Sequence, residues 1–348
     1  MKIFNYKINL KNPPFIIAEL SANHNNDIDR VFKLIDEAKK AGANAVKIQT
    51  YTPDTITLNS KNKFFQISDK NNLWKNRYLY DLYKEGSMPW NWHRRIFSYA
   101  KKKKIICFSS PFDETAVNFL RNFNVPAYKI ASFENQHLPL LKSIIKINKP
   151  IIVSLGATKL KEILELNKLF KKNNYKNYCF LKCTSSYPAP VNESNLKTIS
   201  DLRNKFNIEI GLSDHTPGIG VAIAAIVCGA TIIEKHFTLG RDDGGLDDIF
   251  SITPNELNTL VVEGKRAWES IGKVTYNISK SEKKSLKFKR SIFASKKISK
   301  GDKFSRENIK IIRPNNGLNP KYYDKIIGKT CAKNISFAHP IRKKDVKF

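Results

Sequence analysis

The chain has 348 residues, of which 41% are hydrophobic and 11% aromatic, which excludes a disordered chain and suits one large domain with a small one. Lysine and arginine number 61 against 31 acidic residues, and the formal net charge of +30 would suit nucleic acid or an anionic membrane. Because these basic residues are scattered through nearly every predicted helix, we expect no nucleic acid and no membrane as partner, although the positive field would attract a small phosphate-bearing substrate.

The first predicted elements are a strand, a helix and a second strand. Residues 15–19 form an apolar run that ends in a carboxylate, and residues 28–41 carry apolar side chains at helical spacing. Residues 43–49 predict the next strand, in which Lys47 shares a face with Gln49. A lysine inside an apolar strand requires an anionic partner.

The same alternation continues along the chain. Six more apolar runs follow, at residues 105–109, 127–131, 150–153, 178–184, 211–215 and 232–236. Eight such runs, alternating with amphipathic helices over about 270 residues, predict a (β/α)₈ barrel whose chemistry lies at the C-terminal ends of the strands. A doubly wound open sheet is the alternative, but it would carry a glycine-rich phosphate loop after an early strand, and the sequence has none there.

Two neighbouring strands are predicted to end in a histidine. Alternation places Ser213 and His215 on one face of the first strand, and Glu234 and His236 on one face of the second. The apolar stretch between them suits one helix, so the two strand ends meet on the same side of a parallel sheet. The imidazoles could form a metal site or an acid/base pair. For either histidine alone, a hydrogen-bonded structural residue is the alternative.

Polar side chains at the other strand ends should gather at the same rim. They are Glu19, Lys47, Gln49, Ser110, Lys129, Ser132, Ser154, Lys182, Ser213, Asp214, Glu234, Lys235 and, in the loop after the last strand, Asp247. Lysines with hydroxyl donors hold a phosphate or a carboxylate, and histidines with nearby carboxylates hold a divalent cation. The rim therefore predicts a site for a small anionic substrate and a metal.

Two segments depart from the regular alternation of predicted strands and helices. Residues 51–89 are far longer than an ordinary βα loop, which indicates a lid or substrate-recognition segment, with a packing excursion as the alternative. After the last predicted barrel helix the chain becomes polar. We place the barrel domain at residues 1–278, a linker at 279–289 and a small module at 290–348, which is too small for a large core and should pack on the barrel or on another subunit.

The cysteines and the first residues bear on the compartment. The five cysteines are an odd number without a close CxxC pair, which is typical of reduced core thiols. Residues 1–14 are polar and do not resemble a secretory leader. The uncharged stretch at residues 216–233 is interrupted by Pro217 and glycines, so it reads as a buried helix and strand. We expect a cytoplasmic protein.

Nearly the whole chain resembles the sialic acid synthase family. The motifs that carry the resemblance are Glu19 with Asn23-His-Asn25, Ser109-Ser-Pro-Phe112, Tyr128-Lys-Ile-Ala-Ser132, Cys183-Thr with Tyr187-Pro, Gly211-Leu-Ser-Asp-His215, Glu234-Lys-His-Phe-Thr238 and Arg313-Pro-Asn-Asn-Gly317. The resemblance implies a TIM barrel followed by a C-terminal SAF (antifreeze-like, β-clip) domain, and condensation of phosphoenolpyruvate with an amino-sugar aldehyde.

Segments in and around the insertion are most similar to the pseudaminic acid synthase branch of that family. They are Ser21-Ala-Asn-His24, Gln49-Thr-Tyr-Thr-Pro-Asp-Thr55, Leu73-Trp74, Leu79-Tyr-Asp-Leu-Tyr83 and Pro89-Trp-Asn-Trp-His93. The sugar would then be 2,4-diacetamido-2,4,6-trideoxy-L-altrose. N-acetylneuraminate and legionaminate synthases, which share the mechanism, are the alternative, and a basic polyanion-binding protein is a rival from another class.

The resemblance also implies roles for single residues. His215 and His236 would bind a divalent metal, Mn²⁺ foremost with Mg²⁺ or Co²⁺ as alternatives, that polarises the aldehyde. Glu19 would stabilise the cation that develops at C2 of phosphoenolpyruvate and direct the water that adds there. The phosphate and carboxylate would be held by Lys47, Ser110, Lys129, Ser132, Ser154 and Ser213. The sugar would be contacted by Gln49, Tyr187, Asp247 and, from the SAF domain of the partner subunit in a domain-swapped homodimer, Arg313.

Some positions depart from the family pattern. Asn26 stands where a glycine is usual, and Leu155-Gly-Ala-Thr158 replaces a Thr-Gly-Met-Ala pattern. Leu246 replaces a proline before Asp247. None of these changes removes a predicted catalytic group, but the last bears on contacts to the sugar. A surface arginine in a turn is the alternative for Arg313.

Overall fold

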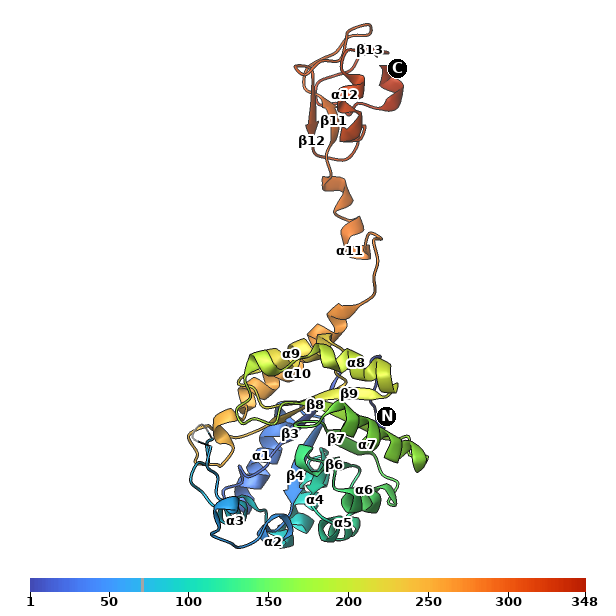
Figure 1. Cartoon of the computed structure of the whole chain (residues 1–348). Helices are drawn as coiled ribbons and strands as arrows, with labels where there is room; N and C mark the ends of the chain where they lie inside the picture. The colour runs from blue at the N-terminus through green and yellow to red at the C-terminus, as the bar shows by residue number, and fades with distance from the viewer. Residues whose placement is uncertain (70–71) are drawn as a thin grey trace. The chain divides into compact units, whose positions relative to one another are not determined.

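The computed structural model describes residues 1–69 and 72–348. The chain divides into two compact units, Met1–Gly272 and Lys273–Phe348 (Figure 1). The first unit buries an extensive apolar core, and the second has a smaller core of its own.

Eight parallel strands of the first unit close into a barrel in the order β10-β3-β4-β5-β6-β7-β8-β9 (Figure 1). The strands are β3 (Phe15–Glu19), β4 (Ala45–Thr50), β5 (Ile106–Pro111), β6 (Tyr128–Ile130), β7 (Ile151–Ser154), β8 (Tyr178–Cys183), β9 (Glu209–Asp214) and β10 (Ile232–His236). The predicted (β/α)₈ barrel is therefore confirmed, and β10 lies between β9 and β3.

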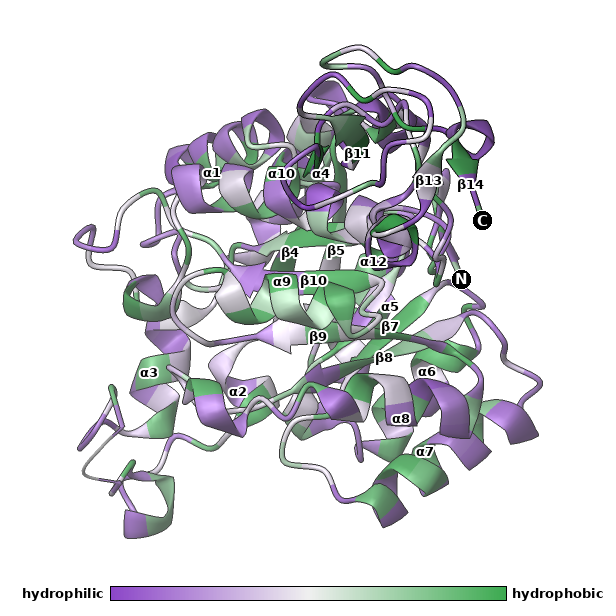
Figure 2. Ribbon diagram, turned by 90° about the horizontal axis from the view of Figure 1, so that it is seen from above, coloured by the Kyte–Doolittle hydropathy of each residue, from purple (hydrophilic) through white to green (hydrophobic). Residues whose placement is uncertain are grey.

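Helices cover the outside of the barrel. They are α1 (Ile28–Lys40), α4 (His93–Lys102), α5 (Glu114–Arg121), α6 (Leu138–Ile145), α7 (Leu160–Lys172), α8 (Lys197–Phe206), α9 (Gly220–Val227) and α10 (Pro254–Ile271). In α1 the buried residues Val31, Leu34, Ile35 and Ala38 recur at helical spacing, and the Asp27 carboxylate caps the first turn by accepting from the Asp29 amide. In Figure 2, α1, α7 and α8 each carry both hydrophilic and hydrophobic residues.

The interior of the barrel is layered. Its N-terminal half is filled by an apolar cluster to which the strands contribute, among others, Phe15, Ile17, Ala45, Phe108, Ile152, Leu181 and Ile232. A short hairpin of β1 (Lys2–Ile3) and β2 (Tyr6–Lys7) precedes the barrel, and the buried Ile3 belongs to this cluster. We call this cluster the apolar floor. Polar side chains occupy the other half of the barrel, as described below.

The connections after the strands carry short elements at the C-terminal end of the barrel. The segment between β4 and α4 contains α2 (Pro53–Ile56), the 3₁₀ turn η1 (Lys63–Phe65), α3 (Leu79–Gly86) and η2 (Trp90–Trp92). We call residues 51–69 and 72–89 of this segment the lid. Shorter 3₁₀ turns follow later strands: η3 (Ser132–Glu134), η4 (Val191–Glu193) and η5 (Asp248–Phe250).

The second unit is built from short strands and turns. Its elements are α11 (Lys280–Lys283), η6 (Leu286–Phe288), β11 (Ser291–Ala294), β12 (Ile309–Ile312), η7 (Pro320–Tyr322), α12 (Tyr323–Ile326), β13 (Thr330–Cys331), η8 (Lys343–Asp345) and β14 (Val346–Lys347). β11 pairs with β12 and β13 with β14, both antiparallel. Ile292, Phe304 and Ile341 are among the residues of its core.

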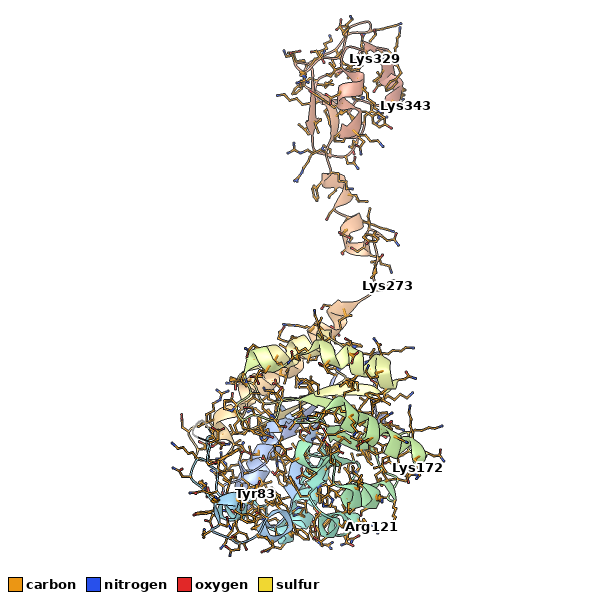
Figure 3. The ribbon with its side chains drawn as sticks, in the orientation of Figure 1. Tyr83, Arg121, Lys172, Lys273, Lys329 and Lys343 are labelled. Atoms are coloured by element: carbon orange, nitrogen blue, oxygen red, sulfur yellow. The ribbon has the colours of Figure 1, made fainter. Side chains whose placement is uncertain are left out.

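Basic residues are spread over the surfaces of both units. Figure 3 labels exposed examples in the first unit, Arg121 and Lys172, and in the second, Lys273, Lys329 and Lys343. Of the helices in the described part of the chain, none has both the length and the apolar composition that crossing a membrane demands.

Candidate active site at the C-terminal end of the barrel

Each barrel strand changes from apolar to polar along its inward face. Because alternate residues of a strand share a face, the residue two positions after each apolar inward residue also points into the barrel. In strand order from β3 to β10, the pairs are Ile17 and Glu19, Ala45 and Lys47, Phe108 and Ser110, Ala127 and Lys129, Ile152 and Ser154, Leu181 and Cys183, Gly211 and Ser213, and Ile232 and Glu234. One residue pair per strand thus builds a polar layer on the apolar floor.

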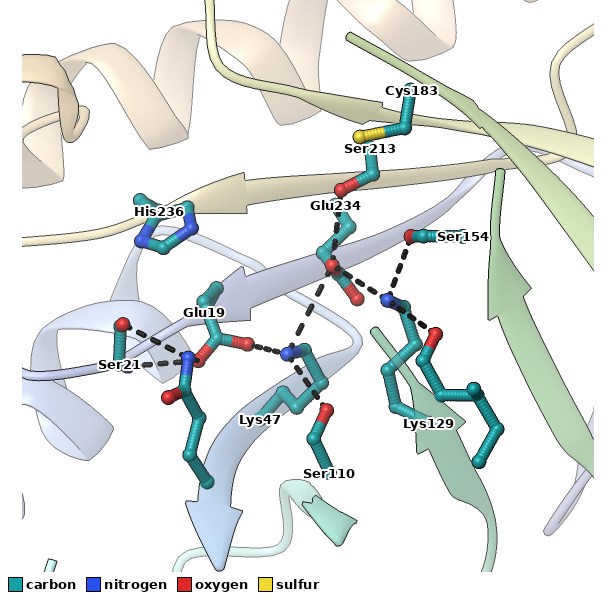
Figure 4. A network of polar contacts seen from close by, with 12 residues as sticks. Glu19, Ser21, Lys47, Ser110, Lys129, Ser154, Cys183, Ser213, Glu234 and His236 are labelled. Carbon is teal, nitrogen blue, oxygen red and sulfur yellow. Dashed lines mark hydrogen bonds and ion pairs between the residues drawn. The ribbon is translucent and has the colours of Figure 1, made fainter. Parts of the chain in front are cut away.

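Glu19 and Lys47 form a buried ion pair in this layer (Figure 4). Glu19 is 1% exposed and Lys47 3%. The other oxygen of Glu19, Oε1, accepts from the Ser21 amide at 2.9 Å and from Gln49 Nε2 at 3.4 Å. Lys47 Nζ also donates to Ser110 Oγ at 3.2 Å. Burial by itself would lower the pKa of Lys47, but the charges of Glu19 and Glu234 outweigh it and raise the pKa, so this amine is protonated.

Glu234 is the second carboxylate of the layer and lies between two lysines (Figure 4). Its Oε1 is 3.4 Å from Lys129 Nζ and 3.9 Å from Lys47 Nζ, and it accepts from Ser213 Oγ at 3.2 Å. Burial would raise the pKa of Glu234, but the two ammonium groups lower it. Its other oxygen, Oε2, is buried without a hydrogen-bond partner among the described residues. That oxygen is free to accept from a ligand.

Lys129 completes the charged layer. Its Nζ donates to Ser154 Oγ at 2.7 Å and to the Ile130 carbonyl at 3.2 Å. Burial and the neighbouring Lys47 lower the pKa of Lys129, although Glu234 opposes the shift. Two lysines and two glutamates therefore balance one another inside the barrel. An incoming phosphate or carboxylate would find two amines and several hydroxyl donors already gathered.

Ser132 lies at the edge of this layer and is positioned through Gly156. The Gly156 amide donates to Ser132 Oγ at 3.1 Å. A Cβ at residue 156 would lie 2.7 Å from Ser132 Oγ and would also clash with Ser185 Oγ, so any other residue would displace these two hydroxyls.

His215 and His236 lie above the polar layer and face each other, with ring centroids 5.3 Å apart. His215 Nδ1 is 3.0 Å from the Thr184 carbonyl, which can only accept, so this nitrogen carries the proton and Nε2 keeps its lone pair. His236 Nδ1 is buried, has no hydrogen-bond partner among the described residues and lies 3.5 Å from Asp247 Oδ2. Tyr187 packs on His215 with ring centroids 4.3 Å apart.

Two imidazoles facing one cavity fit a divalent transition metal that takes its other ligands from water and substrate. No group of three or more histidine, cysteine or acidic side chains in residues 1–69 and 72–348 is arranged as a complete metal site. A metal at these histidines would therefore have open positions.

Asp247 links this pair to the first strand. Its Oδ2 accepts a short hydrogen bond from Ser21 Oγ, and Gln49 Nε2 donates to the same hydroxyl at 3.0 Å. Burial would raise the pKa of Asp247, but His236 and Ser21 lower it, so the group is a carboxylate. Ser21 has a positive φ of 43°, which turns the chain sharply just after β3.

Most of these groups open into one cavity of about 560 Å³. The predicted site residues that line it are Lys47, Gln49, Lys129, Ser132, Ser154, Tyr187, Ser213, His215, His236 and Asp247, while Glu19 and Ser110 lie directly behind Lys47.

Comparison with known proteins identifies the family. The family model described as the NeuB family matches residues 34–276, and that of the SAF domain matches residues 289–347. The chain belongs to the NeuB family.

Individual relatives agree with this assignment. The chain is 43% identical over 345 residues, 99% of both chains, to a pseudaminic acid synthase of Campylobacter jejuni. It is 39% identical over 335 residues, 96% of this chain and 98% of the relative, to a pseudaminic acid synthase of Helicobacter pylori. The crystal structure of an N-acetylneuraminic acid synthetase from Leptospira borgpetersenii matches with a TM-score of 0.73 at 32% identity, covering 82% of this chain and 94% of that one. The resemblance to sialic acid synthases and the predicted SAF domain are thus confirmed.

Some residues of this NeuB-family chain that we expected at the rim face the other way. Lys235 and Asp214 form an ion pair of 2.9 Å, and Lys235 also donates to the Thr216 carbonyl. Lys235 on β10 and Asp214 on β9 point outward, toward the helices, whereas their neighbours Glu234 and Ser213 point into the barrel. Lys182 likewise follows the outward Phe180 and bonds to Thr184 Oγ1 at 3.3 Å. The expectation that these three residues belong to the rim was wrong, because consecutive residues of a strand alternate faces.

Arg313 lies in the SAF unit, in an exposed turn directly after β12. Ser291 Oγ organises this turn: it donates to the Pro314 carbonyl at 2.7 Å and accepts from the Asn316 and Gly317 amides. Ser21 and the lid residue Trp74, by contrast, line the cavity without having been singled out as site residues from the sequence. The signal for both residues was the similarity of their segments, Ser21-Ala-Asn-His24 and Leu73-Trp74, to the pseudaminic acid synthase branch, whereas the direction in which Ser21 points follows from the backbone turn.

Proposed function

We propose that the chain is a pseudaminic acid synthase, which condenses phosphoenolpyruvate with 2,4-diacetamido-2,4,6-trideoxy-L-altrose and releases phosphate. The observation that carries the proposal is the 43% identity to the Campylobacter jejuni pseudaminic acid synthase over 99% of both chains. The cavity, with amines and hydroxyls beside two histidines, supports the same chemistry.

In this proposal the charged layer binds phosphoenolpyruvate. Lys47, Lys129 and the hydroxyls of Ser110, Ser132, Ser154 and Ser213 hold its phosphate and carboxylate. The two amines, which pair with Glu19 and Glu234 in the structure, would exchange part of that interaction for contacts to the incoming anion.

The sugar aldehyde lies above phosphoenolpyruvate, beside His215 and His236. A divalent metal held by these histidines, for which we expect Mn²⁺, would supply Lewis-acid polarisation of the C1 carbonyl. C3 of phosphoenolpyruvate forms the new bond to C1 while the C1=O π bond opens, and positive charge develops at C2; the C1 oxygen takes up a proton to become a hydroxyl, and the water that later adds to C2 gives one up. Glu19 stabilises that charge and orients the water that adds to C2, after which the C2–O bond breaks and phosphate leaves. Gln49, Tyr187 and Asp247 contact the sugar.

We further propose a homodimer in which Arg313 of the partner's SAF unit completes the sugar site. The turn that presents Arg313 supports this role, because it leaves this residue exposed on the surface of the SAF unit. We place the enzyme in the cytoplasm, in keeping with five free cysteines.

The test is product formation with two sugars. Purified protein, phosphoenolpyruvate and Mn²⁺ are incubated with 2,4-diacetamido-2,4,6-trideoxy-L-altrose or with N-acetylmannosamine, and the nine-carbon acid and phosphate are quantified. We expect a higher kcat/KM for the former sugar. A clear preference for N-acetylmannosamine would instead establish a neuraminate synthase.

A further inference from the structure

The cavity has two chemically different ends. Its inner end is the charged layer of Lys47, Lys129 and Glu234. The lid lines its outer end with the apolar or aromatic residues Ile56, Trp74, Leu79, Leu82 and Tyr83 and also with the polar residues Asp69 and Asn72. The loop after β10 contributes Leu246 to the same end.

Trp74 ties the lid to the loop after β10, which lies beside it in Figure 1. Its indole Nε1 donates to the Leu246 carbonyl at 3.3 Å, across 172 positions of sequence. Leu246 also packs against the end of α3, since a Cβ at Gly86 would lie 3.3 Å from Leu246 Cδ1. The next residue is Asp247, which approaches His236. The hydrogen bond of Trp74 therefore fixes the loop that carries both an apolar wall and an active-site carboxylate.

Trp74 also reaches the histidines through Tyr187. The ring centroids of Trp74 and Tyr187 are 6.1 Å apart, and those of Tyr187 and His215 are 4.3 Å apart. The lid tryptophan thus belongs to a continuous aromatic wall that runs from the outer end of the cavity to the histidine pair.

The chemistry fixes which end of the sugar meets this wall. The charged layer, in which we place phosphoenolpyruvate, is the deep end of the cavity, since Lys47 and Lys129 are 3% and 2% exposed. The sugar carbon that reacts with it, C1, must lie nearest that layer, so the far end of the sugar, C6, extends toward the lid. In the proposed substrate C6 is a methyl group, which gains from contact with apolar side chains.

We propose that Trp74 and Leu246 form the subsite for the C6 methyl group and select 6-deoxy sugars over sugars that carry a 6-hydroxyl. This inference rests on the proposed function. The indole N–H is already used by the Leu246 carbonyl, so the pair presents a ring and a leucine side chain to the ligand. A hydroxyl placed against that surface loses its water without gaining a partner. Leu246 acts by contact, and Trp74 acts by contact and by positioning Leu246.

The experiment compares kcat/KM for the 6-deoxy substrate and for its 6-hydroxy counterpart, 2,4-diacetamido-2,4-dideoxy-L-altrose. Wild-type enzyme should prefer the 6-deoxy sugar by about 10- to 100-fold, the range that one group in an apolar pocket provides. Leu246→Ser should reduce this preference about tenfold. Trp74→Phe keeps an aromatic ring but loses the indole N–H that bonds to the Leu246 carbonyl. It should raise KM for the sugar, with smaller changes in kcat and in KM for phosphoenolpyruvate.

Two matched variants serve as controls. Leu58→Ser makes the same change at an exposed lid residue that does not line the cavity, and it should leave the preference intact. Trp268→Phe removes another indole donor, whose Nε1 bonds to the Leu10 carbonyl at 2.9 Å, and it should leave KM for the sugar unchanged. Thermal melts verify that each variant is folded.

The outcomes separate the inference from the function on which it rests. If wild-type enzyme converts the 6-deoxy sugar but has no preference over the 6-hydroxy sugar, the inference is overturned and the function stands. The same holds if Leu246→Ser and Trp74→Phe are folded and keep the wild-type preference and KM. If wild-type enzyme converts neither altrose sugar but converts N-acetylmannosamine, both are overturned.

Discussion

Glu19 and Lys47 are register partners on β3 and β4, and their side chains form an ion pair inside the barrel. In the proposed mechanism Glu19 stabilises charge at C2, and Lys47 is one of two amines that face the anion. Binding and catalysis would then be coupled through one contact, and this contact makes the proposed roles of both residues testable.

Glu19→Gln keeps the shape of the side chain and its acceptor for the Ser21 amide, but removes the charge. We expect kcat to fall by about 10²- to 10⁴-fold, as is typical when a catalytic acid or base is lost. Steady-state phosphate release measures the effect. Glu209→Gln is the matched control, because Glu209 pairs with Arg203 at the start of β9, away from the cavity. Turnover close to wild type in Glu19→Gln would contradict the proposed role.

Lys129 and Lys235 are both buried strand lysines, but they face opposite sides of the barrel wall. Lys129→Met should raise KM for phosphoenolpyruvate by about 10- to 100-fold, since a hydrogen bond to a charged group contributes about 1.5–3 kcal/mol. Lys235→Met should lower the free energy of unfolding by about 3–5 kcal/mol, because Asp214 is left buried without its partner, and should have little effect on KM. Kinetics and urea unfolding of both variants distinguish binding from structure. If Lys129→Met and Lys235→Met change KM for phosphoenolpyruvate equally, Lys129 is not part of an anion site.

Glu134 predicts a pH dependence of stability. It lines the cavity with a buried Oε2 that has no hydrogen-bond partner among the described residues. Burial raises its pKa from 4.5 to about 7, although Lys129 opposes the shift. Because the folded protein holds the proton more tightly, this stabilisation is complete below pH 4.5 and is lost as pH rises through about 7.

Glu134→Gln should therefore have a higher free energy of unfolding than wild type at pH 8. This gain over wild type should exceed the gain at pH 5 by about 1–2 kcal/mol, after allowance for the partial exposure of the residue. Urea unfolding of variant and wild type at both pH values measures the difference. Glu165→Gln changes an exposed glutamate on α7 and should show no such pH-dependent gain. A gain of the same size at both pH values would refute the raised pKa.

Metal binding can be measured without turnover. Mn²⁺ should raise the melting temperature of wild-type protein and of a His339→Ala control in the SAF unit, because a ligand that binds the folded state stabilises it. His215→Ala and His236→Ala should each lose this stabilisation. If both variants respond to Mn²⁺ like wild type, the histidines are not its ligands.

A shared site can be tested by mixing two inactive variants. Glu19→Gln impairs the barrel and Arg313→Ala impairs the SAF unit, so in a domain-swapped homodimer a mixed dimer contains one intact site. Subunit exchange should restore up to about a quarter of the wild-type sites. Activity that stays at the sum of the two variants would show that Arg313 serves its own barrel or none.

The sequence predicted those parts of the site that follow from strand periodicity. Alternation placed Ser213 with His215 and Glu234 with His236, and the structure brings both pairs to one cavity. The same rule, applied to consecutive residues at the strand ends, would have excluded Lys235, whose partner is Asp214 on the outer face.

Other features depend on contacts that no local pattern records. The bond between Trp74 and the Leu246 carbonyl joins two loops that are distant in sequence, and neither loop has a regular period. The role of Glu234 as the counter-ion of two lysines likewise depends on the closure of the barrel, which brings β10 next to β3. Periodicity determines which face a residue occupies, but only the closed barrel determines its neighbours.

The apolar floor has a kinetic consequence. It fills the barrel below the polar layer with apolar side chains, so the cavity lies between that layer and the lid. In the proposed function the reactant in the deepest position would arrive before the sugar blocks its path, and the phosphate formed there would leave after the nine-carbon product. We therefore expect an ordered turnover.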